Sequence, residues 1–213
     1  MQALGMIEVY GFSTAVSVAD AAAKAADVKI IAFDRNRPFG KFPVPLIMEV
    51  KLTGNVAAVK AAVEAAKKIA KDKHRYIVSH VIANPGNGVE KLAYKMDINK
   101  DKFNKKLPKS FLNVDLDTVS GPATSIGLLE VEGLVASIEG LDAMVKAADV
   151  KLIHTEKRLG GRLVTLVVDG TVSAVTSAIE AGKINAEPLG KVYGTEVIAN
   201  PHSEVMKFFN TDV

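Results

Sequence analysis

The chain contains no cysteine and no tryptophan, and aromatic residues make up only 6% of its 213 residues. The absence of cysteine excludes disulfides, thiolate zinc sites, iron–sulfur clusters held by cysteine and a cysteine nucleophile. It also agrees with a reducing compartment. Because alanine and valine supply most of the apolar residues, the helices are expected to be slim and closely packed.

Long apolar runs and a strong excess of charge are also missing. No apolar stretch approaches the roughly 18 residues that a membrane-spanning helix needs. The first residues lack the basic region of a signal peptide. The net charge of +3 is too small to argue for nucleic acid. With 48% hydrophobic and 24% charged residues, the sequence predicts a soluble, intracellular globular protein without a membrane or nucleic-acid partner.

Motifs for catalysis and for metal binding are scarce. The four histidines occur singly, without the spacing of a zinc site. The stretch 97–101 (DINKD) imitates the start of an EF-hand, but Lys102 and Pro108 stand where the calcium loop needs glycine and glutamate. No glycine-rich phosphate loop of the GxxxxGK[ST] type is present. We therefore predict a protein without catalytic residues, metal or cofactor.

An internal repeat organises the sequence. The stretch VIANP occupies residues 81–85 and returns at 197–201, while AADVK occupies 25–29 and returns at 147–151. The second pair lies at an offset of 122, and the same offset relates Gly5, Glu8, Gly11, Asp20 and Lys24 to Gly127, Glu130, Gly133, Asp142 and Lys146. VIANP lies at an offset of 116, which also relates Gly54, Val56, Val59 and Glu64 to Gly170, Val172, Val175 and Glu180. Two matched blocks in the same order indicate a duplicated domain.

The drop in offset from 122 to 116 means that the first copy carries six extra residues between Ile31 and Thr53. We place the first copy at 1–96, a polar linker at 97–123 and the second copy at 124–213. A repeat period above 100 residues is too long for a solenoid unit, so each copy is expected to have its own core.

Within one copy the pattern predicts strand, helix, strand, strand, helix, strand and a short final helix. In the first copy the strands are expected at 4–11, 28–33, 46–52 and 76–83, and the helices at 13–26 and 56–66. Asn55 and Thr171 are capping residue types just before the second helix of each copy. The order βαββαβ predicts the α+β fold class, as two tandem ferredoxin-like domains.

The loops between the second and third strands stand out by charge. DRNRPFGKFPVP in the first copy and EKRLGGRL in the second each contain one acidic and three basic residues, a net charge of +2. Gly160 and Gly161 permit positive φ and leave backbone N–H groups open to an anion. An ordinary exposed hairpin loop explains the same residues equally well. Glu8 and Glu130 take equivalent positions in their copies, which does not favour an acid–base pair in one cleft.

The repeat resembles a known family at this point. ALGMIEVYG at 3–11, followed by ADAAAKAADVKII, is similar to the start of a bacterial microcompartment shell domain. In the second copy the resemblance runs from IGLLEVEGL through LDAMVKAADVKLIHTEKRLGGRLVTLVVDG to VIANPH. It covers nearly the whole chain, twice, in the unpermuted strand order. The chain thus resembles the tandem-domain subclass, in which three chains form a ring shaped like a hexamer.

The resemblance implies a structural shell protein of a bacterial microcompartment in the cytoplasm. It implies a homotrimeric pseudohexamer that tiles with other shell proteins and passes small metabolites through a central pore. Six loops at +2 give a rim of about +12, which favours anions. The longer first loop is expected to make the pore asymmetric. The pore-lining residues implied are Arg35, Asn36, Arg37, Pro38, Phe39, Gly40, Lys41, Arg158, Leu159, Gly160, Gly161 and Arg162.

The resemblance also implies edge contacts between tiles. Lys24 and Lys146 occupy the position of the family's edge lysine. Asn84 and Asn200 stand where the family usually has an arginine that docks into the neighbouring tile, a departure from its pattern. Because the chain has no cysteine, it lacks the iron–sulfur cluster that some tandem relatives hold at the pore.

Two other functions fit duplicated ferredoxin-like domains. One is a protein that binds or senses a small molecule and changes shape. The other is an α+β-barrel enzyme, which would need a polar pocket inside each sheet, and the predicted strands offer few buried polar candidates. A shell protein forms rings without a ligand, whereas a sensor binds a ligand tightly and changes shape, so assembly separates the shell hypothesis from the sensing hypothesis.

Overall fold

The computed structural model describes residues 2–36, 44–86, 124–156 and 162–209, with the single residues 89, 93 and 160. Among these residues no helix is both long enough and apolar enough to cross a lipid bilayer. The predicted linker at 97–123 and most of the loop between the second and third strands lie outside them.

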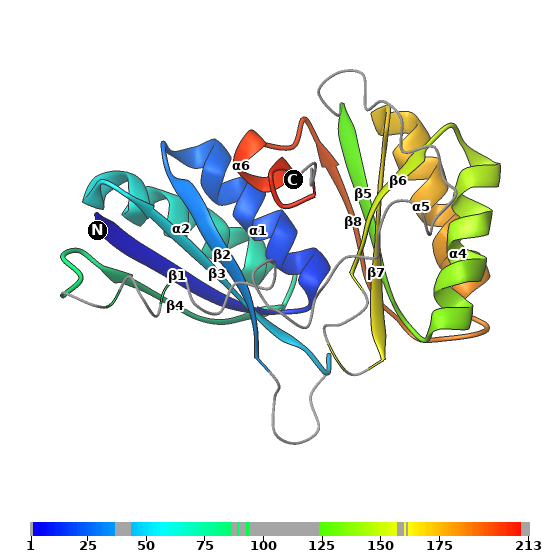
Figure 1. The fold of residues 1–213 in the computed structure, drawn as a ribbon, viewed down its shortest axis with the longest axis horizontal. Coiled ribbons are helices and arrows are strands. Elements are labelled where there is room, and N and C mark those ends of the chain that lie inside the picture. The colour runs from blue at the N-terminus through cyan, green and yellow to red at the C-terminus, as the bar shows by residue number, and fades with distance from the viewer. Residues whose placement is uncertain are drawn as a thin grey trace, which may run out of the picture.

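Each copy forms four strands and two long helices (Figure 1). The first copy consists of β1 (Ala3–Tyr10), α1 (Phe12–Ala25), β2 (Lys29–Asn36), β3 (Ile47–Gly54), α2 (Val56–Asp72) and β4 (Tyr76–Ile82). The second consists of β5 (Ser125–Glu132), α4 (Leu134–Ala147), β6 (Lys151–Glu156), β7 (Leu163–Gly170), α5 (Val172–Ala186), β8 (Val192–Ala199) and α6 (Ser203–Met206).

The two sheets have the same topology. The first sheet has the strand order β2-β3-β1-β4 and the second has β6-β7-β5-β8, and all neighbouring strands are antiparallel. This is the arrangement of a split βαβ unit closed by a fourth strand. The predicted α+β class with tandem ferredoxin-like domains is confirmed.

Local sequence explains how these elements begin and how closely they pack. The side chains of Asn55 and Thr171 accept a hydrogen bond from the N–H group three residues on, at 2.9 and 3.2 Å, and so cap α2 and α5 as predicted. Gly127, in the middle of β5, lets α5 approach the sheet, because a side chain there would overlap Val175 and Ile179. Gly5 does the same for α2 on β1.

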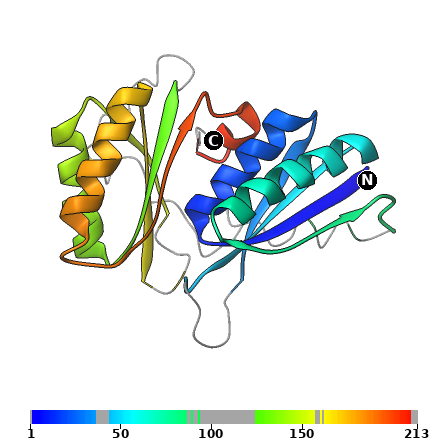
Figure 2. The ribbon, with the colours of Figure 1, turned by 180° about the vertical axis from the view of Figure 1, so that it is seen from behind.

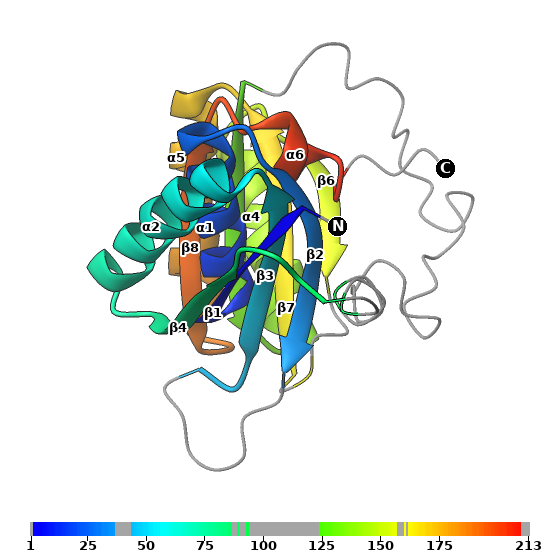
Figure 3. The same cartoon turned by 90° about the vertical axis from the view of Figure 1, so that its left-hand side faces the viewer.

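The copies pack in layers, with the helices of the first copy against the sheet of the second. In each copy both helices cover one face of the sheet, and we call the other face the open face. Figure 3 shows α1 and α2 together on one face of the first sheet. Helix α1 also lies against the open face of the second sheet (Figures 1 and 2), whereas α4 and α5 lie on that sheet's far side.

The apolar core follows this layering. The second copy has a core of its own between its sheet and helices, built around Leu129, Met144 and Val168. The core of the first copy is continuous with the open face of the second sheet, through residues such as Leu128 and Val167. Each copy thus has a core, but that of the first copy also extends onto the second sheet, because α1 packs on two sheets at once.

Candidate functional site

A buried glutamate joins the two copies. Glu130 lies in the middle of β5 on the open face of the second sheet and is 1% exposed. Its carboxylate accepts hydrogen bonds from the backbone N–H of Phe12 at 3.1 Å and of Ser13 at 3.3 Å, and from Ser13 Oγ at 3.0 Å. The first N–H groups of a helix have no partner within the helix. Glu130 therefore caps α1 from the other copy.

Burial shapes the protonation of this carboxyl group. Loss of solvent raises the pKa of Glu130, and the hydrogen bonds from Phe12 and Ser13 and the charge of Arg75 oppose the rise. The positive end of the α1 dipole faces the same carboxylate. The contact is thus polar, fully enclosed and specific in geometry.

A glycine on the neighbouring strand makes room for it. Gly194 of β8 is the register partner of Glu130. A side chain at this position would overlap Ser13 Oγ. The close approach of α1 to the second sheet therefore depends on Gly194.

We call the interface between α1 and the open face of the second sheet the joint. The C-terminal half of α1 adds two polar contacts to it. Lys24 Nζ pairs with Asp20 at 2.6 Å and donates to the Ala199 carbonyl of the second copy at 2.9 Å. The backbone N–H of His202 donates to Asp20 Oδ1 at 2.8 Å. Lys24, predicted to lie at a tile edge, thus takes part in the joint between the copies.

The end of α2 contributes an ion pair. Lys73 Nζ lies 2.7 Å from Glu196 Oε2, and the Arg75 guanidinium donates to the Tyr193 carbonyl at 3.0 Å. Burial raises the pKa of Glu196, and its hydrogen bond and charge interaction with Lys73 oppose the rise. The residues after α6 add an aromatic contact with the first copy, in which Phe208 packs edge-on against Phe33 with ring centroids 4.8 Å apart.

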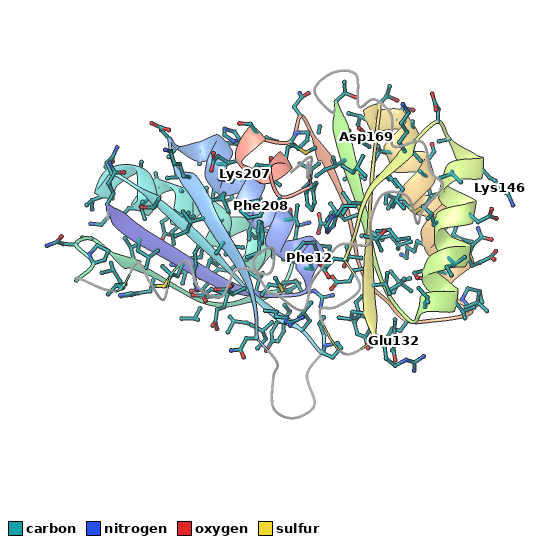
Figure 4. All side chains as sticks on the ribbon, viewed as in Figure 1. Phe12, Glu132, Lys146, Asp169, Lys207 and Phe208 are labelled. Atoms are coloured by element: carbon teal, nitrogen blue, oxygen red, sulfur yellow. The ribbon has the colours of Figure 1, made fainter. Side chains whose placement is uncertain are left out.

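Helix α4 occupies in the second copy the place that α1 has in the first, but nothing in the described structure covers it. Four of its apolar side chains are exposed, by 58%, 70%, 61% and 46%: Leu134, Val135, Ile138 and Val145. The repeat relates them to four buried residues of α1, namely Phe12, Ser13, Val16 and Ala23. Figure 4 shows Phe12 between the copies and Lys146 on the outer side of α4.

The open face of the first sheet is more exposed than that of the second. Glu8, the counterpart of Glu130, is only half-buried. Beside it, Lys51 forms an ion pair with Asp34 and lies 3.5 Å from Glu49. Burial raises the pKa of Glu49, Lys51 opposes the rise, and the charge of Glu8 adds to it. This face is thus polar and partly open to solvent.

The predicted pore residues lie at or beyond the strand ends. Arg35 and Asn36 are the last residues of β2. Gly160 and Arg162 precede β7 and have φ of 101° and 61°, so the predicted positive φ is confirmed at Gly160. Arg162 Nη1 lies 3.6 Å from Glu132 Oε1. The other eight predicted pore residues lie outside the described residues: Arg37, Pro38, Phe39, Gly40, Lys41, Arg158, Leu159 and Gly161.

The remaining predicted edge residues are exposed. Lys146 pairs with Asp142 at 2.6 Å, and this hydrogen bond raises the pKa of the lysine. Asn84 lies just beyond β4 and Asn200 just beyond β8. Asn200 has φ of 45°, and its backbone N–H donates to the Thr124 carbonyl at 2.9 Å. Their role at a tile edge stays a prediction.

Within the described residues no group of three or more His, Asp or Glu side chains is arranged to bind a metal ion. The sequence does not predict the contact between the copies, since neither Ser13 nor Gly194 belongs to a functional motif. A signal was available, because a glutamate recurs in the middle of an apolar strand of each copy (Glu8, Glu130). A glycine before each first helix recurs with it (Gly11, Gly133).

The topology and the joint define a duplicated α+β protein in which the helices of one copy pack on the open sheet face of the next. The chain belongs to the BMC domain family, whose model matches residues 3–85 and 125–201. Both copies are therefore BMC domains, in tandem and unpermuted. The predicted class, a bacterial microcompartment shell protein, is confirmed, and with it the location in such a shell in the cytoplasm.

The chain is similar to several curated relatives. It is 33% identical over 205 residues to the carboxysome assembly protein CcmO of Synechococcus elongatus, covering 96% of this chain and 67% of that protein. It is 46% identical over 83 residues to the bacterial microcompartment shell protein PduA of Salmonella typhimurium, covering 39% of this chain and 87% of PduA. A solved microcompartment protein of Desulfitobacterium hafniense aligns over 97% of this chain and 99% of its own, at 22% identity and a TM-score of 0.38.

Proposed function

We propose that the protein is a structural, non-catalytic tile of a microcompartment shell, in which three chains close a pseudohexameric ring around a central pore. The single observation that carries the proposal is the joint between the copies. Within one chain, α1 packs on the open face of the second sheet, while α4 and the open face of the first sheet have no such partner among the described residues.

A head-to-tail joint of this kind can repeat between chains. The surface that receives a helix and the surface that supplies one are different, so the contact is heterologous. Each chain supplies one unused helix surface and one unused sheet surface. If the joint between chains has the same rotation as the joint within a chain, six domains close a ring, and three chains supply them.

The pore is proposed at the ends of the second and third strands. In Figure 1 the end of β2, the start of β3, the end of β6 and the start of β7 all point toward the same side of the molecule. The twelve residues predicted for the rim belong to these ends and to the loops between them. Each loop carries a net charge of +2, which favours passage of small anionic metabolites.

Local pairing changes that charge in both directions without reversing it, because Asp34 is neutralised from outside its loop and Arg162 is partly neutralised by Glu132. Asp34 is buried and pairs with Lys51, so its charge is compensated away from the loop. The exposed Arg162 lies near Glu132, a contact that solvent screens. The remaining basic residues of the two loops supply the proposed preference for anions.

Tiling with other shell proteins is the second part of the proposal. Lys24, Asn84, Lys146 and Asn200 are the proposed edge residues. CcmO is described as an assembly protein of the carboxysome and PduA as a shell protein of a microcompartment. By analogy, the partners proposed here are two further copies of this chain and other shell proteins of the same compartment.

The first experiment measures the mass of the purified chain by light scattering, followed by negative-stain imaging at higher concentration. Three chains of 22.6 kDa give a trimer of about 68 kDa, which should appear as discs or sheets. A stable monomer or dimer without rings would contradict the proposal. It would favour a protein that binds a small ligand, to be tested next.

The second experiment tests the pore. Arg37→Ala combined with Arg158→Ala removes one positive charge from each loop and should slow uptake of inorganic phosphate into closed shells that contain this protein. Uptake of a neutral solute of similar size should change much less. Lys67→Ala combined with Lys183→Ala removes the same charge from α2 and α5 and serves as the matched control. Equal uptake of phosphate by all three shells would contradict a preference for anions.

A further inference from the structure

The repeat allows the contacts within a chain to be transferred to the contact between chains. This inference rests on the proposed ring. Glu130 of the joint corresponds to Glu8 on the open face of the first sheet. Phe12 and Ser13 at the start of α1 correspond to Leu134 and Val135 at the start of α4. Glycines with φ of 88° and 95°, Gly11 and Gly133, give the two helices the same entry geometry.

The polar contacts of the C-terminal half of the helix transfer as well. Asp142 and Lys146 of α4 form the same ion pair as Asp20 and Lys24 of α1, at 2.6 Å in both copies. The carbonyl of Ala199, which accepts from Lys24, corresponds to that of Ala83 after β4. Lys146 is thus arranged to donate to Ala83 of a second copy.

One pair of positions does not transfer unchanged. Within the chain, Ser13 fits against Gly194, and Ser13 Oγ donates to Glu130. The counterpart of Gly194 is Val78. Val78 is the register partner of Glu8, as Gly194 is of Glu130. A serine and a glycine in one joint are therefore replaced by two valines in the other.

Both valines are exposed in the single chain. Val135 is 70% exposed and Val78 is 49% exposed, on surfaces that the repeat equates with two that are in contact. Exposed large apolar side chains gathered on one helix face are typical of a protein contact rather than of a solvated surface. Leu134 and Ile138 extend the same face of α4.

We propose that the start of α4 docks on the open face of the first sheet of a second copy of this chain. Glu8 of that copy accepts the backbone N–H groups of Leu134 and Val135, and Val135 packs against Val78. Beside the glutamate, the joint within a chain has a serine against a glycine, and the joint between chains has two valines in contact.

The replacement of Ser13 and Gly194 by Val135 and Val78 also determines which helix fits which sheet. Ser13 placed on the first sheet would meet Val78 where the joint within the chain requires glycine. Val135 placed on the second sheet would leave Glu130 without its hydroxyl donor. Each wrong pairing carries a clash or an unsatisfied buried group, so the two kinds of domain alternate around the ring.

The test uses a charge at the proposed contact. Val135→Asp places a carboxylate against Glu8, and we expect assembly to require about a hundredfold higher protein concentration, because like charges juxtaposed in an interface cost several kcal/mol. Val172→Asp is the matched control. Val172 begins α5 and is exposed, but its counterpart Val56 is exposed as well, so this position belongs to neither joint.

A second variant identifies the partner residue. Val78→Lys combined with Val135→Asp introduces an opposite-charge pair and should restore the trimer, with mass measured by light scattering. Thermal unfolding confirms that each variant is folded.

The outcomes separate this inference from the proposed function. A wild-type trimer that Val135→Asp leaves intact would overturn the docking of α4 while the ring stands. Dissociation by Val135→Asp without rescue by Val78→Lys would overturn the pairing of these two residues. A wild-type chain that forms no trimer would overturn the ring and this inference together.

Discussion

Helices α1 and α4 occupy the same position in two copies of one domain, and they have opposite surroundings. Both are 14 residues long, yet ten residues of α1 are buried and only four of α4. The difference arises because α1 lies between two sheets whereas α4 packs on one. The same supersecondary unit therefore becomes a core element in one copy and a surface element in the other.

The residue types agree with this division. The outward face of α1 has Ser13, Val16 and Ala23, which are small enough to fit against the second sheet. The corresponding residues of α4 are the larger Val135, Ile138 and Val145. A helix that remained in solvent would gain nothing from these larger apolar side chains, so their presence argues for a partner.

We expect the largest effect on stability from a substitution in α1 whose counterpart in α4 is exposed. Phe12→Ala removes a buried ring that lies 5.9 Å from the ring of Phe33, and it should lower the free energy of unfolding by about 3–5 kcal/mol. Leu134→Ala, at the same position of the second copy, should change it by less than about 0.5 kcal/mol in the dissociated chain. Urea unfolding at low protein concentration measures both. Equal losses would contradict the different burial of the two helices.

A smaller effect is expected where the two joints differ in shape. Gly194→Val gives the second sheet the residue of the first, displaces Ser13 Oγ from Glu130, and should cost about 1–3 kcal/mol. The reverse change, Val78→Gly, should cost about 0.5–1 kcal/mol, because it adds backbone freedom without removing a buried contact. The midpoints of urea unfolding compare the two. A larger loss for Val78→Gly would show that close approach at Gly194 is unimportant.

The pH dependence of the free energy of unfolding tests the burial of Glu130. Burial raises the pKa of Glu130 in the folded state, so protonation of this carboxyl group stabilises the fold. This stabilisation is fully present below the unfolded-state pKa of about 4.3 and is lost as the pH rises through the folded-state pKa. The stability of the wild type minus that of Glu130→Gln should therefore fall on going from pH 4 upward. It should change by about 1.4 kcal/mol for each unit by which the two pKa values differ.

Unfolding curves of both proteins between pH 4 and 8 give this difference directly. Taking the difference cancels the groups that the two proteins share, provided they titrate independently of residue 130. A difference that increases with pH would contradict a raised pKa for Glu130.

The smallest effect concerns the two edge lysines. Lys24→Met removes the hydrogen bond to Ala199 and the ion pair with Asp20, and it should cost about 0.5–1 kcal/mol, since solvent screens the partly exposed ammonium group. Lys146→Met should cost less in the single chain, because Lys146 lacks the equivalent carbonyl contact among the described residues. Thermal unfolding compares them. In the assembled ring the order would change, with Lys146→Met lowering the fraction of trimer.

Much of the fold could be read from short-range patterns. The alternation in β1, the capping types at Asn55 and Thr171, and the repeated VIANP stretches led to the observed topology and family. The proposed pore and edge residues came from the resemblance instead. The joint between the copies was not predicted, because Ser13 and Glu130 lie 117 residues apart and neither belongs to a recognised motif.

The presence of two like domains, each with the order βαββαβ, follows from the sequence alone, because periodicity and capping are local and recur in the same order at offsets of 122 and 116. The burial of Glu130, in contrast to the partial exposure of Glu8, depends on tertiary packing, since the two occupy the same place in the repeat. Burial depends on what packs against a residue. Helix α1 covers the open face of the second sheet, and no helix in the described part of the chain covers the open face of the first.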